Sequence, residues 1–185
     1  MANKDAPFGF RPTKMLGGAP FNGGQTEYGI ESTYNTNIFT GDVVALNTNG
    51  TIIIGAATSD KLIGVFNGCF YTDPTTSKPT FKNYWPASVA AEAQAFVYDN
   101  PDDLFEVQSE GTLVRATVAR AVDMAYTTGA TINGRSKEEI SVTAGADLAV
   151  RVVRISGDPA NSDIASANAN WIVKFNQHIY YNYST

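Results

Sequence analysis

Short apolar runs separated by turn-forming residues recur along most of the chain. The runs are rich in Val, Ile, Thr, Tyr and Phe, and several alternate apolar with polar positions. This pattern is typical of strands that bury one face. We predict strands at Tyr28–Ser32, Asp42–Leu46, Thr51–Ile54, Lys61–Phe66, Cys69–Tyr71, Phe81–Trp85, Ala93–Tyr98, Ile140–Thr143, Ala149–Ile155 and Trp171–Asn176. Many short strands at regular spacing indicate a β-barrel or a β-sandwich.

Asn-Gly pairs interrupt these apolar runs at two places. Asn49-Gly50 lies between the runs 43–46 and 51–54. Because both residues tolerate positive φ, the pair predicts a tight hairpin turn between two strands. Asn67-Gly68 likewise closes the run that ends at Phe66.

Residues 113–125 break the strand pattern. The segment contains many Ala and no Gly or Pro, and its apolar positions recur at helical spacing from Val114 to Ala125. We predict one short helix here. A strand is the alternative, because the alternation through Thr117 and Val118 is also compatible with a sheet.

The first thirty residues differ from the rest of the chain. Pro and Gly are frequent there, which prevents a regular helix or a long central strand. The segment also carries Phe8, Phe10 and Phe21, whereas disordered tails are usually poor in aromatic residues. We interpret residues 1–26 as an extended N-terminal arm that docks on a neighbouring chain, with a floppy terminus as the alternative. Residues 27–185 then form a single mainly β barrel or sandwich domain.

Composition and charge restrict the possible partners. The net charge is −5 and no basic cluster occurs, so we expect no nucleic-acid contact, which requires clustered Lys and Arg. No apolar run approaches the length of about 20 residues that spans a bilayer, and the first residues do not resemble a secretory signal. The single Cys69 cannot form an intrachain disulfide, which fits synthesis in a reducing host cytoplasm.

Candidate catalytic or metal-binding groups are few. His178 is the only histidine, so one chain cannot build a multi-His metal site. Cys69 is better explained as a small buried residue than as a reactive thiol. The acidic segment 99–103 could offer oxygen ligands to calcium, but a solvated turn is the simpler interpretation. Glu138-Glu139 is a weaker candidate for a site of paired carboxylates, because the side chains of adjacent residues point apart on either a strand or a helix. We predict no catalytic, cofactor-binding or metal-binding residue, and no enzymatic activity.

Aromatic residues at both ends of the chain suggest contacts with other proteins. Tyr and Trp are enriched in protein–protein interfaces, and a tail of tyrosines is explained if it docks on a partner. Seven residues are candidates for partner binding: Phe8, Phe10, Arg11, Phe21, Tyr180, Tyr181 and Tyr183.

Short motifs along the chain resemble those of known virion proteins. One set consists of Pro7–Pro12, Gly17-Gly18, Phe105–Gln108, Asn133–Ser136 and Val173–His178. Its order and spacing resemble a group of small structural proteins of tailed phages. A second set consists of Thr40–Val44, Asn49–Ile52 and Ile63–Val65. Its order is similar to the head-decoration proteins of lambda-like phages, which are β-rich trimers on the capsid lattice.

The resemblance implies a capsid decoration (cement) protein on the outer surface of the virion. Such a protein forms a homotrimer, binds the major capsid protein and clamps neighbouring subunits together. The resemblance brings no enzymatic residue and no cofactor. The alternative is a tail, fibre or head-protrusion protein that binds host-surface carbohydrate. A major capsid protein would be longer, and an enzyme on a β scaffold would need a cleft with opposed carboxylates.

Overall fold

The computed structural model describes residues 2–55, 62–87 and 92–181. Antiparallel strands dominate this part of the chain, which confirms the mainly β prediction, and neither large sheet closes into a barrel. The elements are β1 (Arg11–Met15), β2 (Thr26–Glu31), β3 (Ile38–Phe39), β4 (Val43–Leu46), β5 (Ile52–Ile54), β6 (Leu62–Thr72), β7 (Pro79–Lys82), β8 (Tyr84–Trp85), β9 (Glu92–Tyr98), β10 (Asp103–Gln108), the 3₁₀ turn η1 (Arg115–Thr117), β11 (Ala121–Ala125), β12 (Glu139–Gly145), β13 (Val150–Ile155) and β14 (Asn170–Phe175).

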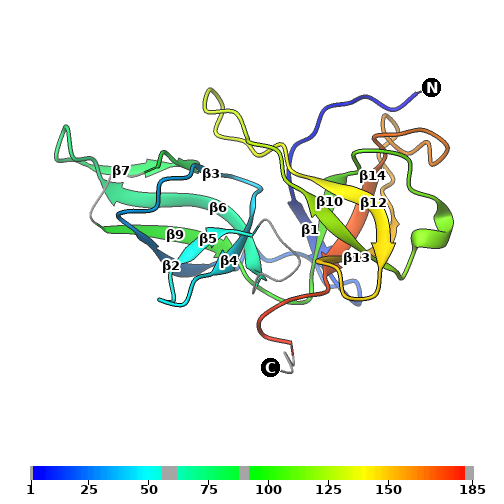
Figure 1. The fold of residues 1–185 in the computed structure, drawn as a ribbon, viewed down its shortest axis with the longest axis horizontal. Helices are drawn as coiled ribbons and strands as arrows, with labels where there is room; N and C mark the ends of the chain where they lie inside the picture. Colours follow the sequence, from blue (N-terminus) through cyan, green and yellow to red (C-terminus); the bar gives the residue numbers. More distant parts are fainter. Residues whose placement is uncertain (1, 56–61, 88–91, 182–185) are drawn as a thin grey trace.

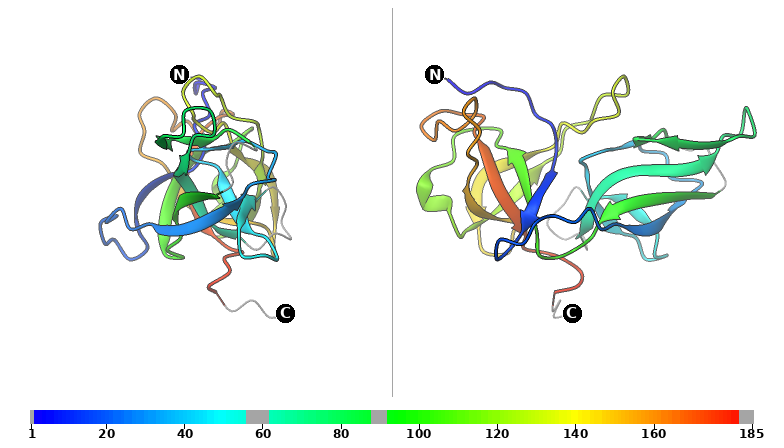
Figure 2. Two further views of the ribbon diagram at one scale, coloured as in Figure 1. Left: turned by 90° about the vertical axis from the view of Figure 1, so that its left-hand side faces the viewer. Right: turned by 180° about the vertical axis from the view of Figure 1, so that it is seen from behind.

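The strands form two lobes side by side (Figure 1). Lobe I contains a six-stranded sheet in the order β1-β10-β14-β13-β11-β12. Lobe II contains the sheet β2-β9-β6-β4-β5, in which β7 also pairs with β6, and the small sheet β3-β8. The view from behind shows the same two bodies, with the β6–β7 hairpin farthest from lobe I (Figure 2).

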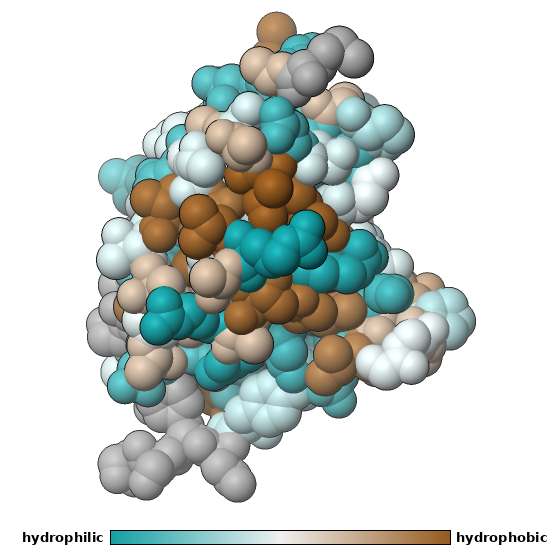
Figure 3. Space-filling view, turned by 90° about the vertical axis from the view of Figure 1, so that its right-hand side faces the viewer, coloured by the Kyte–Doolittle hydropathy of each residue, from teal (hydrophilic) through white to brown (hydrophobic). Residues whose placement is uncertain are grey.

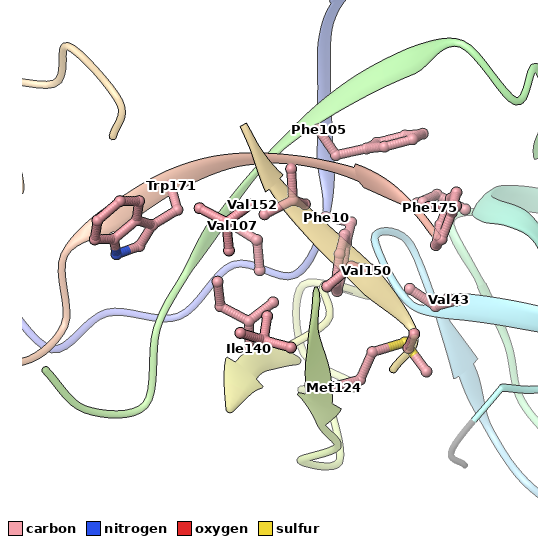
Figure 4. Close-up of a cluster of buried hydrophobic side chains, with 14 of the residues drawn as sticks. Phe10, Val43, Phe105, Val107, Met124, Ile140, Val150, Val152, Trp171 and Phe175 are labelled. Carbon is pink, nitrogen blue, oxygen red and sulfur yellow. The ribbon is translucent and has the colours of Figure 1, made fainter. Parts of the chain in front are cut away.

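Strands β4 and β6 contribute side chains to the hydrophobic cores of both lobes. Successive strand residues point to opposite faces of a sheet. Val43 and Ala45 on β4 therefore pack into the core of lobe I, whereas Val44 between them packs into the core of lobe II. On β6, Val65 packs into lobe I and Ile63 into lobe II, because the pairing with β4 shifts by one residue at Ile63. In lobe I, Val43 belongs to the cluster that also contains the rings of Phe105 and Phe175 and aliphatic side chains of β12 and β13 (Figure 4). The two cores thus share the strands that separate them.

The Asn49-Gly50 hairpin is confirmed. β4 and β5 pair from Leu46↔Ile52 to Val44↔Ile54, and Gly50 has a φ of 77°. Asn67-Gly68, in contrast, does not end a strand. β6 continues through the pair, and Asn67 is an extra residue between the partners Phe66↔Val97 and Gly68↔Phe96. The second Asn-Gly pair is therefore a β-bulge.

The predicted helix over residues 113–125 is wrong. Only the 3₁₀ turn Arg115–Thr117 is helical, and residues 121–125 form a strand between β12 and β13. Ala119 has a φ of 67°, which breaks any continuous helix. The segment gains more from the ladder with its two neighbours than an isolated Ala-rich helix would gain, because short helices are marginal on their own.

The N-terminal segment is part of lobe I and not a separate arm. β1 pairs with β10, and Asn3 donates hydrogen bonds to the carbonyl groups of Asp163 and Ala167. The strands of residues 27–185 are distributed over both lobes. The apolar residues near the N-terminus explain why this segment belongs to lobe I, because they complete the core of their own chain.

Candidate functional site

Three segments from distant parts of the sequence meet where the lobes join. We call residues 8–10, 39–43 and 133–138 the junction. Phe10 N–H donates to the carbonyl of Gly41 (2.8 Å), and Ser136 N–H donates to the carbonyl of Thr40 (2.9 Å). A methyl group on Gly9 would lie only 2.5 Å from Ser136 Cβ. The junction is therefore closely packed backbone to backbone.

A pair of buried carboxyl groups lies within the junction. Asp42 and Glu138 are both fully buried, and they belong to different lobes. Asp42 Oδ2 accepts a hydrogen bond from Phe39 N–H (2.7 Å), and Glu138 Oε2 accepts one from Val43 N–H (2.8 Å). Burial raises the pKa of Asp42 to about 6, and burial together with the charge of Asp42 raises the pKa of Glu138 well above its usual value.

A cleft of about 390 Å³ opens beside the junction, between β1 of lobe I and β6 and β9 of lobe II. Its walls are apolar or aromatic, and Asn67, Asn83 and Arg135 provide polar groups. Among the described residues that line this cleft there is no carboxylate, so the cleft lacks the opposed acids that glycoside hydrolysis requires.

Phe8 and Arg11, two predicted partner-binding residues, lie together at the cleft. The Arg11 guanidinium is 4.7 Å from the centroid of the Phe8 ring and forms an ion pair with Glu106. Glu106 also accepts a hydrogen bond from Ser156. Arg11 is exposed and Phe8 is half-buried, so both could still contact a ligand in the cleft.

Phe10 and Phe21 contact their own chain. Phe10 is only 2% exposed and packs against the rings of Phe105 and Phe175 at centroid distances of 6.4 and 6.2 Å. The prediction that Phe10 binds a partner is therefore wrong, because its side chain belongs to the core of lobe I. Phe21 is half-buried and lies edge-on to Tyr98, with ring centroids 5.1 Å apart.

The C-terminal tyrosines bind the acidic segment of the same chain. Tyr181 donates to Asp102 Oδ1 and accepts a hydrogen bond from Lys174 Nζ (2.8 Å). The Tyr180 hydroxyl lies 3.0 Å from that of Tyr28, which donates to Asp99 Oδ2. The tyrosine tail and the acidic turn, which are far apart in the sequence, therefore hydrogen-bond to each other within the chain. Tyr183 lies outside the described residues.

The remaining reactive side chains are held in structural positions. Cys69 is buried, and burial raises the pKa of its thiol to about 12, which keeps it protonated. His178 is 1% exposed, and its Nδ1 accepts a hydrogen bond from Tyr180 N–H (3.2 Å). Burial lowers the pKa of His178. Within residues 2–55, 62–87 and 92–181, no group of three or more His, Cys, Asp or Glu could hold a metal ion.

Lobe II exposes an aromatic surface that sequence reasoning missed. Phe70 and Phe81 are direct cross-strand partners and are 41% and 60% exposed. The ring of Phe96 lies 5.9 Å from that of Phe81. We call Phe70, Phe81 and Phe96 the aromatic face. The aromatic face lies on the side of β6, β7 and β9 that points away from the core. Cys69 and Ala95, the chain neighbours of Phe70 and Phe96, point into the core of lobe II, so the two phenylalanines point outward.

Lobe I exposes a second apolar surface at the opposite end of the molecule. Val114 and Val118 flank η1 and are 58% and 38% exposed, and Val142 on β12 is 42% exposed. We call these three residues the valine patch. Figure 3 shows apolar side chains gathered on this end of the molecule. Single exposed apolar residues are ordinary, but a cluster on a small domain often marks a contact surface.

Several of these features could have been found from the sequence only in part. Phe70, Phe81 and Phe96 stand in predicted strands, but their common outward direction depends on the pairing of three strands. The Asp42–Glu138 pair joins residues far apart in the chain, and no local pattern indicates it. In the sequence, the only carboxylate beside Glu138 is its chain neighbour Glu139.

Comparison of the chain with protein-family models, with curated proteins and with solved structures found no match. Among the residues that the structure describes, no helix has the length and apolarity that a membrane crossing requires. The assignment of a function therefore depends on the surfaces and on the short motifs of the chain itself.

Proposed function

We propose that this chain is a capsid decoration (cement) protein that binds the outside of a tailed-phage head and stabilises contacts between major capsid subunits. The observation that carries the proposal is the presence of two exposed apolar surfaces on different lobes, the aromatic face and the valine patch. A protein with two separate contact surfaces can bridge two neighbours. A homotrimer at the three-fold positions of the lattice is part of the same proposal.

The connection between the lobes suits a bridging role. Lobe I is joined to lobe II by strands β4 and β6, which serve both cores, by the junction hydrogen bonds and by the C-terminal segment, in which Ile179 N–H donates to Leu62 O (2.9 Å). A rigid spacer loses little conformational entropy on binding, so the second contact benefits from the first. Interfaces of about 800 Å² per partner are common for specific complexes, and several weaker contacts per trimer could replace one large contact.

The cleft favours a second candidate function, binding of host-surface carbohydrate by a tail, fibre or head-protrusion protein. Its aromatic walls and the amide groups of Asn67 and Asn83 are suitable for the apolar faces and hydroxyl groups of a sugar. However, the face of the Phe8 ring under Arg11 and the side of Tyr98 against Phe21 are already occupied. The cleft therefore supports this candidate less strongly than the two surfaces support the first.

Image reconstruction of purified virions tests the location and the copy number. Density for this chain at the three-fold positions of the shell, in numbers that match the lattice, would support the cement proposal. Density only at the tail or at a single vertex would contradict it and favour the carbohydrate candidate.

Binding of purified variants to shells that lack this chain tests the surfaces. Phe70→Ser with Phe81→Ser, and separately Val114→Ser with Val118→Ser, should each weaken binding by about tenfold or more, because buried apolar anchors dominate interfaces. Ile132→Ser is the matched control, since Ile132 is 94% exposed but lies outside both surfaces. Unchanged binding of both double variants would show that these surfaces are not the contacts.

A further inference from the structure

Asp42 and Glu138 connect the lobes through carboxyl groups that have no cationic partner. Among the described residues, neither takes part in an ion pair. Each uses one oxygen to accept a backbone N–H, and Asp42 Oδ1 and Glu138 Oε1 are buried without a hydrogen-bond partner in the geometry of the junction. A buried charge without a partner is costly, so this arrangement is unfavourable when both groups are ionised.

The surroundings of the pair contain few other ionisable groups. Burial, and then the charges of Asp42 and Glu138, raise the pKa of the Tyr126 hydroxyl, and Tyr34 acts on it more weakly. The Ser136 hydroxyl lies beside Asp42 and lowers its pKa. On the other sides, the N-terminal segment contributes Gly9, and β6 contributes the backbone of Phe66, which exchanges hydrogen bonds with the turn.

We propose that Asp42 and Glu138 form a proton-operated clip between the two lobes, closed while the pair holds at least one proton and opened when both carboxyl groups ionise. In the closed state, a proton on either group leaves at most one negative charge in the buried junction. When that proton is lost, two like charges that act on each other lie in a low-dielectric environment, and their repulsion is relieved only if water enters.

The direction of the pH dependence follows from burial. Both groups have a higher pKa in the folded chain than in an unfolded one, about 6 against 3.8 for Asp42 and well above 4.5 for Glu138. The folded state therefore binds more protons, and the junction is most stable below the unfolded pKa values. Its stability decreases as the pH rises through the folded values.

Opening of the clip would break a defined set of contacts. Separation of the two segments would break the hydrogen bonds from Val43 N–H to Glu138, from Thr40 N–H to Gly134 O and from Ser136 N–H to Thr40 O. These are the bonds between the β3–β4 turn of lobe II and the 133–138 segment of lobe I. The clip would thus control how firmly the two lobes are held, independently of what the apolar surfaces bind.

Hydrogen exchange of the intact protein between pH 5 and pH 9 tests the clip. After correction for the intrinsic pH dependence of exchange, protection of the Val43, Thr40 and Ser136 amides should fall by at least about tenfold across this range, because each pH unit above the folded pKa values changes the equilibrium by about that factor. Amides in the centre of β14 should keep their protection. Glu138→Gln keeps an acceptor for Val43 but cannot ionise, so its junction amides should stay protected throughout.

Asp42→Asn provides a second variant if Glu138→Gln does not fold, and Glu27→Gln, at an exposed position, is the control that should behave like the unchanged protein. Unchanged protection in the unmodified chain would overturn the proposal, as would full pH dependence in both junction variants. Restored protection on adding calcium at pH 9 would also overturn it, because a cation and not a proton would then hold the pair.

Discussion

Replacement of Gly9 by Ala should destabilise the chain through the junction. Gly9 has a φ of 76°, and an added Cβ would lie 2.5 Å from Ser136 Cβ and 2.7 Å from the carbonyl oxygen of Gly41. The left-handed backbone alone costs a side chain about 1–2 kcal/mol. Overpacking against atoms that cannot move freely adds about 1–3 kcal/mol. We therefore expect a loss of about 2–5 kcal/mol in the free energy of unfolding.

Gly23 provides a matched control. Its φ of 74° is nearly that of Gly9, but an added Cβ would meet nothing within 4 Å. Gly23→Ala should therefore show the backbone cost alone, about 1–2 kcal/mol. Urea unfolding followed by tryptophan fluorescence measures both variants. With an m-value of about 1–3 kcal/mol/M, the two midpoints should differ by about 1 M. Equal losses in the two variants would refute the close packing of the junction.

Three further predictions concern the core, the acidic segment and the C-terminal segment. Phe10→Ala should lower the free energy of unfolding in urea by about 3–5 kcal/mol, because it leaves a cavity beside the rings of Phe105 and Phe175. A loss below about 1 kcal/mol would place Phe10 outside the core. Burial, and then the charges of Asp99 and Asp102, raise the pKa of Asp103 to about 6. Asp103→Asn should therefore reduce the loss of thermal stability between pH 4 and pH 7. If the variant loses as much stability over this range as the unchanged protein, Asp103 is not the source of the pH dependence. Tyr181→Phe should speed hydrogen exchange of the Ile179 amide. It should also raise the pKa of Asp102 in a carboxyl NMR titration, because the hydrogen bond from the Tyr181 hydroxyl holds that pKa low. An unchanged Asp102 pKa would refute this contact.

Local sequence patterns predicted most of the strands. The period-two alternation of residues 93–98 and the apolar runs at 149–155 and 171–176 correspond to β9, β13 and β14. Strands can be predicted from these segments because a strand that buries one face must place apolar side chains at fixed intervals, wherever its partner strands lie. The sequence predicts a helix for residues 113–125 because Ala is compatible with both the helical and the strand period. Only the pairing of β11 with β12 and β13 decided for a strand.

The candidate sites depended more on the tertiary structure. The sequence predicts that aromatic residues at the chain ends contact other proteins, whereas Phe10, Phe21 and Tyr181 contact their own chain in the structure. Sequence cannot distinguish an intramolecular from an intermolecular contact, because both bury the same kind of side chain. The carboxyl pair of the junction left no local signal, since its members come from different lobes.

The two Asn-Gly pairs show what each level determined. The sequence by itself determined that both positions could adopt positive φ, since Gly carries no Cβ, and it determined the apolar runs on either side. At Gly50 the flanking runs pair with each other, and the dipeptide becomes a hairpin turn. At Gly68 the run continues along β9, and the ring of Phe81 lies 2.8 Å from the place that a Cβ would occupy. Only the long-range pairing decided between turn and bulge, because a strand ends where its neighbours stop accepting its hydrogen bonds.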